Sequence, residues 1–208
     1  RDRVLTPWLH GLLQELAGLG PDDPPLTFGN LRCGPQGNGE GGIELCLMTS
    51  CITQGRPYLL PSEKQGFYFD PAEFRRLFPD AVVDYLEGQA ERHCEREPQR
   101  VASRLIRKFS PHLRPLVLGD DLPVIVAARM SLSFPLLISA VPLYGIDWQN
   151  EANQAATGAW EEWKRGNLDR WRAWIGGSEE SVPEGAPAQR LCPDKCWFSD
   201  GGIVSNFP

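Results

Sequence analysis

The sequence predicts an α/β domain in which helices cover the faces of a sheet. Residues 43–53 and 122–128 are apolar runs of the length of buried strands, and an amphipathic stretch with helical spacing lies near the start. Because strand-like and helix-like segments alternate along the chain, we expect a layered arrangement. The 208 residues are enough for one domain, or for one large piece of a bigger domain.

The first helix is expected to begin at Thr6, with Thr6 as its N-cap and Pro7 at the first helical position. Gly18 and Gly20 end it. Residues 33–42, "CGPQGNGEGG", lack the spacing and the lysine of a phosphate-binding loop, so we interpret them as a flexible connection. The apolar face of the helix would consist of Trp8, Leu9, Leu12, Leu13 and Leu16.

The middle of the chain supplies the next elements. Residues 43–53 predict a strand in the sheet interior, which residues 56–60 continue or pair with. Asp70 and Pro71 are typical of a helix start, and a second helix is expected from Asp80. Residues 99–109 are basic and predicted to be exposed.

Residues 122–146 carry one charge, Arg129, and are long enough to span a bilayer. Prolines at 123, 135 and 142 divide them, which favours a central strand at 122–128, a turn or short helix at 127–133 and extended structure at 134–144. We therefore expect no transmembrane segment, and a cytoplasmic protein with at most peripheral membrane contact. A net charge of −6 argues against nucleic acid as the main partner.

Residues 146–196 form a predicted insertion in the main fold. Four tryptophans fall on one side of a helical repeat, interrupted near Gly166, and a polar loop follows. Such a stripe either packs the added helices onto the domain or contacts a lipid surface, where indoles are favoured. The tryptophans are Trp160, Trp163, Trp171 and Trp174.

The six cysteines have irregular spacing, which is not typical of a disulfide framework. Cys192 and Cys196 have the spacing of half a metal site, but no second pair of ligands accompanies them. We interpret the cysteines as free thiols in a reducing compartment, and we expect no metal and no organic cofactor.

Several segments resemble, in order, parts of bacterial patatin-like phospholipases. They are "CITQGRPYLLP", "FYFDPAEFRRLFP", "VAARMSLSFPLL" and "FSDGGIVSNFP". "LTPWLHGLLQELAG" with "PLTFGNL" is similar to the helix and loop that follow the nucleophile in that family. The resemblance runs from about residue 4 to the end, apart from the insertion, and implies a three-layer α/β/α domain related to the α/β-hydrolases.

The resemblance also implies a catalytic role for Asp200. Patatin-like enzymes use a serine–aspartate dyad, and their aspartate lies in an Asp-Gly-Gly or Asp-Gly-Ala motif, matched here by Asp200, Gly201 and Gly202. A carboxylate within hydrogen-bond reach can take the proton of a serine hydroxyl and so activate it. The two glycines would let the backbone turn sharply and leave room beside the carboxylate. By itself, Asp-Gly-Gly is typical of a tight turn.

The chain departs from the family pattern in lacking a G-x-S-x-G nucleophile motif and the glycine-rich oxyanion loop that precedes it. Ser178 follows two glycines, but no glycine stands two places after it. The first helix already matches material beyond the serine, so the nucleophile is expected before Arg1, in a missing N-terminal segment of the same protein. This chain alone is expected to be inactive.

The remaining ionisable candidates have structural interpretations. His10, His93 and His112 are more typical of surface or capping histidines than of a catalytic triad. Arg129, alone in an apolar stretch, either anchors a carboxylate or lipid headgroup or forms a salt bridge at a strand end.

The sequence therefore predicts a lipid acyl hydrolase that cleaves fatty-acyl esters of phospholipids or related lipids, with Asp200 as the half of the dyad present in this chain. The alternative is a non-catalytic lipid-binding or protein-interaction domain on the same scaffold. A strand, G-x-S-x-G and a helix before Arg1 would favour the enzyme.

Overall fold

The computed structural model describes residues 2–20, 22–34, 37, 39–62, 66–96, 101–134, 138–177 and 181–205. Its strands are β1 (Leu47–Cys51), β2 (Arg56–Leu60), β3 (Phe67–Phe69), β4 (Arg114–Pro115), β5 (Val141–Gly145) and β6 (Asp194–Asp200). Its helices are α1 (Asp2–Leu16), α2 (Phe28–Cys33), α3 (Pro71–Phe74), α4 (Asp80–Arg96), α5 (Val101–Phe109), α6 (Val124–Ser131), α7 (Glu151–Gly166), α8 (Leu168–Ile175) and α9 (Gly202–Ser205).

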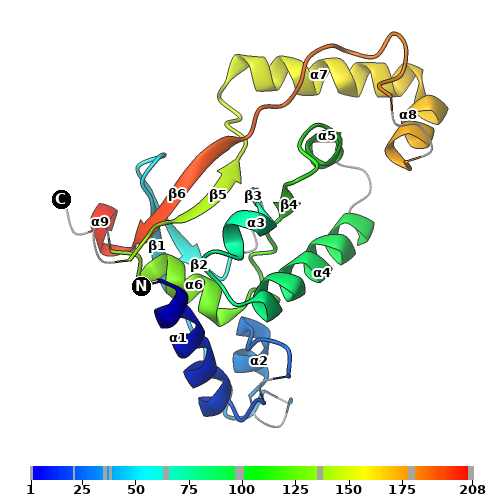
Figure 1. The fold of residues 1–208 in the computed structure, drawn as a ribbon. Coiled ribbons are helices and arrows are strands. Elements are labelled where there is room, and N and C mark those ends of the chain that lie inside the picture. Colours follow the sequence, from blue (N-terminus) through cyan, green and yellow to red (C-terminus); the bar gives the residue numbers. More distant parts are fainter. Residues whose placement is uncertain are drawn as a thin grey trace.

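The described strands form one six-stranded sheet in the order β2-β1-β6-β5-β3-β4, and every neighbouring pair is antiparallel. The chain is thus mixed α/β, as expected from the sequence. Figure 1 shows α1 and α2 at one end of the molecule and α7 and α8 at the opposite end. β6 lies near the middle of the sheet. Its C-terminal end, residues 198–200, pairs with β1, and its N-terminal part, residues 194–198, pairs with β5.

The central strand predicted at residues 122–128 is wrong, because this segment is helix α6. α6 packs against β1, β6 and α1, and its apolar side chains are buried on all sides. A helix buried all round has no polar face, so its apolar run has the same appearance in the sequence as a buried strand. Main-chain bonds fix its start, since the N–H of Val124 donates to the carbonyl of Leu26 over 2.8 Å.

The start of α1 also differs from the prediction. The helix begins at Asp2, so Pro7 lies inside it and Thr6 is not its N-cap. Thr6 is instead buried and accepts a hydrogen bond from Arg129. Of the expected apolar face, Leu9 and Leu13 pack on the core, whereas Trp8 and Leu16 are exposed.

Two further segments correct the sequence-based limits. The strand expected at 43–53 is confined to Leu47–Cys51, and that expected at 134–144 becomes β5 at Val141–Gly145. The segment 99–109, expected to be exposed, is an amphipathic helix over its described part, α5. Val101, Leu105 and Ile106 on one face of α5 are buried, because they pack against the tryptophans of the insertion.

Residues 146–193 leave the sheet and return to it at one point. Gly145, at the end of β5, pairs with Asp194, at the start of β6. The segment between them forms α7 and α8, separated at Asn167 close to the expected interruption, and then a loop back to the sheet. We call residues 146–193 the excursion.

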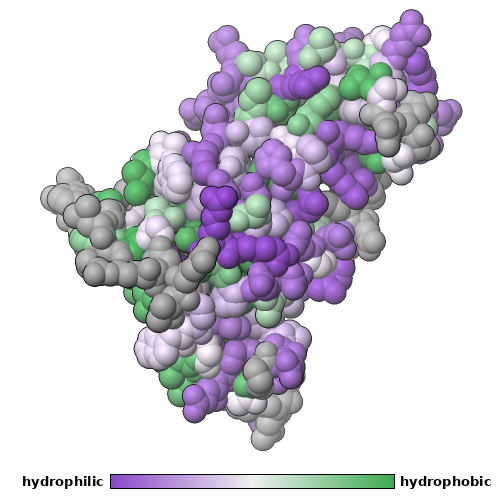
Figure 2. Space-filling model, in the orientation of Figure 1, coloured by the Kyte–Doolittle hydropathy of each residue, from purple (hydrophilic) through white to green (hydrophobic). Residues whose placement is uncertain are grey.

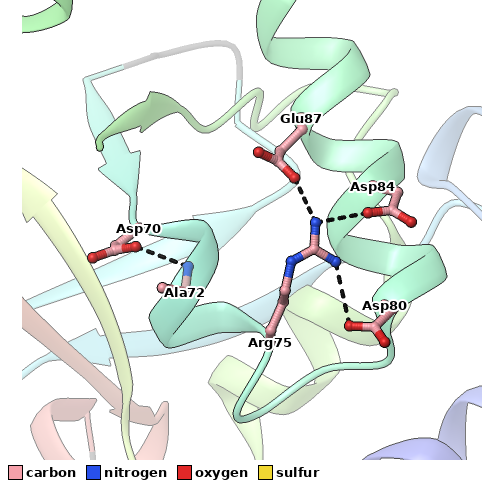
Figure 3. Close-up of polar contacts among 6 residues, drawn as sticks. All are labelled: Asp70, Ala72, Arg75, Asp80, Asp84 and Glu87. Atoms are coloured by element: carbon pink, nitrogen blue, oxygen red, sulfur yellow. Dashed lines mark hydrogen bonds and ion pairs between the residues drawn. The ribbon is translucent and has the colours of Figure 1, made fainter. Parts of the chain in front are cut away.

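The side chain of one arginine, directly after the short helix α3, forms ion pairs with α4 (Figure 3). Asp70 caps α3 as predicted, since its carboxylate accepts from the N–H of Ala72 over 2.8 Å. The guanidinium of Arg75 bonds three carboxylates along α4, and the hydrogen bond to Asp84 raises its pKa above the ordinary value. These carboxylates lie 2.7–3.3 Å from the guanidinium nitrogens and belong to Asp80, Asp84 and Glu87.

Hydrophilic side chains cover most of the molecular face in Figure 2, with hydrophobic ones gathered beside α9 and over α7 and α8. Among the described helices, none has both the length and the apolar character needed to cross a bilayer.

Candidate active site

Asp200 ends strand β6. In the sheet, it lies opposite Thr49 of β1, and its main-chain N–H donates to the carbonyl of Ser133 over 2.9 Å. The residue is half-buried. Main-chain bonds from two directions therefore fix the Cα of Asp200 while its side chain stays accessible at the end of the strand.

The carboxylate of Asp200 is held by one of its two oxygens. The Oδ1 atom accepts from the N–H of Gly202 over 2.7 Å, at the first residue of α9. Within the described part of the chain, the Oδ2 atom has no hydrogen-bond partner. This arrangement orients the carboxylate and leaves one oxygen able to accept a proton from outside the described residues.

Gly201 is required by a close approach to β1. A Cβ at this position would lie 2.5 Å from the carbonyl oxygen of Met48 and 3.0 Å from the Met48 Cβ. On the same side, Ser50 donates its hydroxyl to the carbonyl of Gly201 over 3.2 Å. Neither Gly201 nor Gly202 has a positive φ, so the turn does not depend on the left-handed conformation. Asn206 and Pro208 of the resembling motif lie outside the described residues.

A chain of hydrogen bonds links α1 to Asp200. The Nε atom of Arg129 donates to the hydroxyl of Thr6 over 3.0 Å, and its Nη1 atom donates to the Ser133 hydroxyl over 2.6 Å. The carbonyl of Ser133 then accepts from the N–H of Asp200 and from the hydroxyl of Ser199. Through these contacts the N-terminal half of α1 is fixed beside the end of β6.

Arg129 thus lies on a helix and not at a strand end, as one of its sequence interpretations assumed. Its side chain is 1% exposed, and the Nη1 atom also donates to the Ser139 carbonyl over 3.1 Å. Hydroxyl and carbonyl oxygens satisfy much of its hydrogen-bonding capacity, as a buried guanidinium requires. Arg129 therefore positions α1, α6 and β6 relative to one another.

The serines around Asp200 are engaged elsewhere. Ser50, Ser133 and Ser199 are fully buried, and each donates its hydroxyl to a main-chain carbonyl. No described serine or histidine donates to the Asp200 carboxylate. The described residues therefore offer Asp200 no hydroxyl to activate.

The three histidines lie apart from this site. His10 is on α1, where burial lowers its pKa below the ordinary value of 6.5. His93 is on α4 and half-buried, and His112 is exposed between α5 and β4. None of them forms a described contact with Asp200.

The tryptophans of the excursion form a packed cluster. Trp160 and Trp174 stack with ring centroids 5.0 Å apart, and Trp171 contacts both. Trp160, Trp171 and Trp174 are buried, while Trp163 is half-buried against Trp160. Because these indoles face one another and α5, the geometry supports the packing interpretation of the stripe and not a lipid-facing one.

The opposite end of β6 carries a polar cluster that sequence reasoning missed. The Nζ atom of Lys195 lies 2.5 Å from Glu73 of α3, and Tyr144 of β5 donates to the same carboxylate over 3.3 Å. The hydrogen bond to Glu73 raises the pKa of Lys195 above 10.5. These three residues are far apart in the sequence. The pairing of β5 with β6 sets Tyr144 opposite Lys195, and the pairing of β3 with β5 brings the following helix α3, with Glu73, to them.

Two buried thiols also meet across β1 and β6. Cys51 and Cys196 are 0% and 1% exposed, and a hydrogen bond from Cys196 lowers the pKa of Cys51 to about 7. That hydrogen bond and burial raise the pKa of Cys196. Cys192, which the sequence paired with Cys196 as half a metal site, is exposed. Among the described residues, no group of three or more histidine, cysteine or acidic side chains could hold a metal ion.

Comparison with known proteins finds a similarity over nearly the whole chain. The chain is 40% identical, over 221 residues, to a protein described as "RpoH suppressor" from Rhizobium meliloti (strain 1021). The match covers 99% of this chain but 31% of that protein, so the chain spans about a third of its relative's length. No known protein-family profile matches the chain. No solved structure matches it either.

Proposed function

We propose that the chain contributes the proton acceptor, Asp200, to a lipid acyl hydrolase of the patatin-like kind. The serine nucleophile and the oxyanion donors would come from polypeptide that precedes Arg1 in the same protein. The substrates would be phospholipids or other acyl-ester lipids. Neither a metal nor an organic cofactor takes part in this chemistry.

The observation that carries the proposal is the state of the Asp200 carboxylate. One oxygen is fixed by the Gly202 N–H at 2.7 Å, and the other has no partner among the described residues. A general base needs this combination. The fixed oxygen holds the carboxylate in one orientation, and the unbonded oxygen can accept the proton. The fixed and the free oxygen thus have different roles.

The position of α1 supports a nucleophile from the preceding polypeptide. Thr6 and Arg129 hold the N-terminal half of α1 next to Ser133, whose carbonyl bonds Asp200. Polypeptide that leads into α1 would therefore approach the end of β6. A serine placed on that polypeptide would need only a short path to Oδ2.

The proposed reaction has two balanced steps. The serine oxygen attacks the ester carbonyl while Asp200 takes its proton, and the proton passes to the departing alcohol as the acyl-enzyme forms. Water then attacks the acyl-enzyme, Asp200 takes a proton from the water, and the serine oxygen regains a proton as the fatty acid leaves. Asp200 returns to its starting state.

The layer arrangement of the whole domain and the cellular location of the protein are part of the same proposal. A three-layer α/β/α arrangement would arise as the preceding polypeptide adds to the sheet and covers it. Acyl-ester lipids lie in membranes, so the protein would act from the cytoplasm at a membrane surface. Several apolar side chains on the sheet are exposed, which supports a layer of preceding polypeptide over the sheet. Met48, Leu59 and Trp197 are among them.

The test replaces Asp200 by asparagine in the natural protein. The amide keeps an Oδ1 acceptor for the Gly202 N–H, so α9 remains capped, but it cannot take a proton. We expect ester hydrolysis to fall by about 10²–10⁴-fold, the usual contribution of a general base. The control is Asp194→Asn, which removes an exposed carboxylate from the other end of the same strand.

The assay is turnover of a short-chain acyl ester and of phospholipid vesicles, with circular dichroism to verify folding. Full turnover by Asp200→Asn, or an equal loss in Asp194→Asn, would remove Asp200 from the mechanism.

The second candidate is a non-catalytic lipid-binding or protein-interaction domain. It is favoured by Ser50, Ser133 and Ser199, the buried serines near Asp200 whose side chains are described, because each donates to a main-chain carbonyl. If the polypeptide before Arg1 supplies no serine either, the Asp200 carboxylate is a cap for α9 and nothing more. Absence of esterase activity in the natural protein would select this candidate.

A further inference from the structure

A cavity of about 400 Å³ lies between α4, α5 and β4, away from Asp200. Figure 1 shows α5 and α4 on opposite sides of β4. The volume lies within the range of small-molecule sites, roughly 300–1,000 Å³. Asp200 does not line it, so the cavity is independent of the proposed acid–base site.

Three basic side chains line the cavity from three segments. His93 comes from α4, Arg107 from α5 and Arg114 from β4, against one acidic residue, Glu91. Among the described residues, neither Arg107 nor His93 has an ion-pair or hydrogen-bond partner. Guanidinium groups match carboxylate and phosphate oxygens in geometry as well as in charge. The charge of the cavity therefore fits an anion.

Main-chain contacts hold Arg114 in place. Its Nη1 atom donates to the carbonyls of Pro111 and Leu113 over 2.5 and 3.2 Å. The other N–H groups of this guanidinium are not used by any described residue. A guanidinium fixed on one side and open on the other is already oriented for an anionic group, which reduces the entropy lost on binding.

The cavity wall also has apolar parts, and the space continues beyond the two arginines. Buried Ile106 and Leu113 form part of the wall. A smaller cavity of about 130 Å³ shares Tyr68 and His93 with the first and extends past Leu116 to Trp148. The two arginines line the first cavity alone, and aromatic and aliphatic side chains continue into the second, an arrangement that suits an amphiphile.

We propose that this cavity binds a small amphiphilic anion, with its carboxylate or phosphate monoester at Arg107, Arg114 and His93. Its apolar chain lies along Tyr68 and Leu116 toward Trp148. The site does not depend on the proposed hydrolase activity, since Asp200 lines neither cavity.

The experiment measures binding of three eight-carbon probes to the natural protein by titration calorimetry: octanoate, octyl phosphate and octanol. We expect both anions to bind at least tenfold more tightly than the neutral alcohol, because a hydrogen bond to a charged group contributes the equivalent of about tenfold or more. Octanoate should also bind more tightly than acetate, since each buried CH₂ adds roughly fourfold. The tighter of the two anions identifies the head group.

The variants Arg107→Gln and Arg114→Gln should each weaken octanoate binding by about tenfold or more. Arg170→Gln is the matched control, because Arg170 is exposed on α8 outside the cavity. Circular dichroism establishes that each variant is folded. Equal affinity for octanol and octanoate would overturn the proposal. So would an equal loss in all three variants, or no binding of any probe at millimolar concentration.

Discussion

Trp160 and Trp174 stack on each other but differ in hydrogen bonding. The indole N–H of Trp160 donates to the carbonyl of Gln189 over 2.7 Å. The N–H of Trp174 is buried and has no hydrogen-bond partner among the described residues. Two indole rings of the same cluster therefore differ, because Trp160 donates a hydrogen bond to a described residue and Trp174 does not.

The two positions predict different results for the same substitution. Both Trp160→Phe and Trp174→Phe shrink a buried ring, but only the first breaks a hydrogen bond, the one to the carbonyl of Gln189. We expect Trp160→Phe to lower the free energy of unfolding by about 0.5–1.5 kcal/mol more than Trp174→Phe does. Urea unfolding of the two variants measures the difference. Equal losses would mean that the Gln189 contact contributes nothing.

A second residue-scale prediction concerns the Cys51 and Cys196 thiols. The hydrogen bond from Cys196 lowers the pKa of Cys51 from 9.0 to about 7. Because folding lowers this pKa, the Cys51 ionisation by itself stabilises the fold above the unfolded pKa of 9.0, and that contribution is lost as the pH falls through about 7; the raised pKa of Cys196 acts in the opposite sense above pH 9.

Substitution of Cys196 separates the hydrogen bond from simple burial. Cys196→Ala removes the donor and should raise the pKa of Cys51, whereas Cys196→Ser keeps a donor and should leave it lowered. Ultraviolet titration of thiolate absorbance in both variants is the measurement. The same Cys51 pKa in alanine and serine variants would exclude the hydrogen bond as the cause.

At the scale of the element, the excursion completes a second hydrophobic cluster. Trp160, Trp171 and Trp174 cover the apolar face of α5, which consists of Val101, Leu105 and Ile106. The buried α5 side chains would otherwise meet water. The excursion is therefore part of the folded core at this end of the molecule.

Deletion of residues 150–190 should consequently destabilise the protein. Exposure of each apolar α5 side chain loses roughly 1.5–3 kcal/mol of burial energy. We expect a lower thermal midpoint and binding of a dye that reports exposed apolar surface. An unchanged midpoint with no dye binding would show that the excursion is dispensable for folding. In that case a lid over lipid would again be the better interpretation of the tryptophans.

Sequence reasoning succeeded for elements whose signals are local. The cap at Asp70 and the division of the excursion near Gly166 follow from side chains next to each other in the chain. It failed for α6, where burial on every side hides the helical period, and for the start of α1, where Thr6 bonds Arg129 instead of capping. These failures depend on partners that are distant in the sequence.

At the scale of the whole molecule, the sheet order decides which residues can act together. Placement of β6 between β1 and β5 brings Cys196 to Cys51 and Lys195 to Tyr144 and Glu73. The hydrophobic periodicity of the sequence indicates single strands and helices but not the order of strands in the sheet. These contacts were therefore not predictable from the sequence. Asp200 was predictable as a candidate because its motif is contiguous, but its fixed Oδ1 and free Oδ2 depend on the end of β6 meeting α9.

In the proposed function, Asp200 is one half of a catalytic site, and polypeptide that precedes Arg1 supplies the other half. The relative from Rhizobium meliloti, of which this chain matches 31%, is a longer protein than this chain. The most direct measurement is labelling of the natural protein with a fluorophosphonate, followed by mass spectrometry of the labelled peptide. We predict one labelled serine, in polypeptide that precedes Arg1, and loss of labelling in Asp200→Asn. Labelling of a serine within residues 1–208, or undiminished labelling of the asparagine variant, would contradict the account.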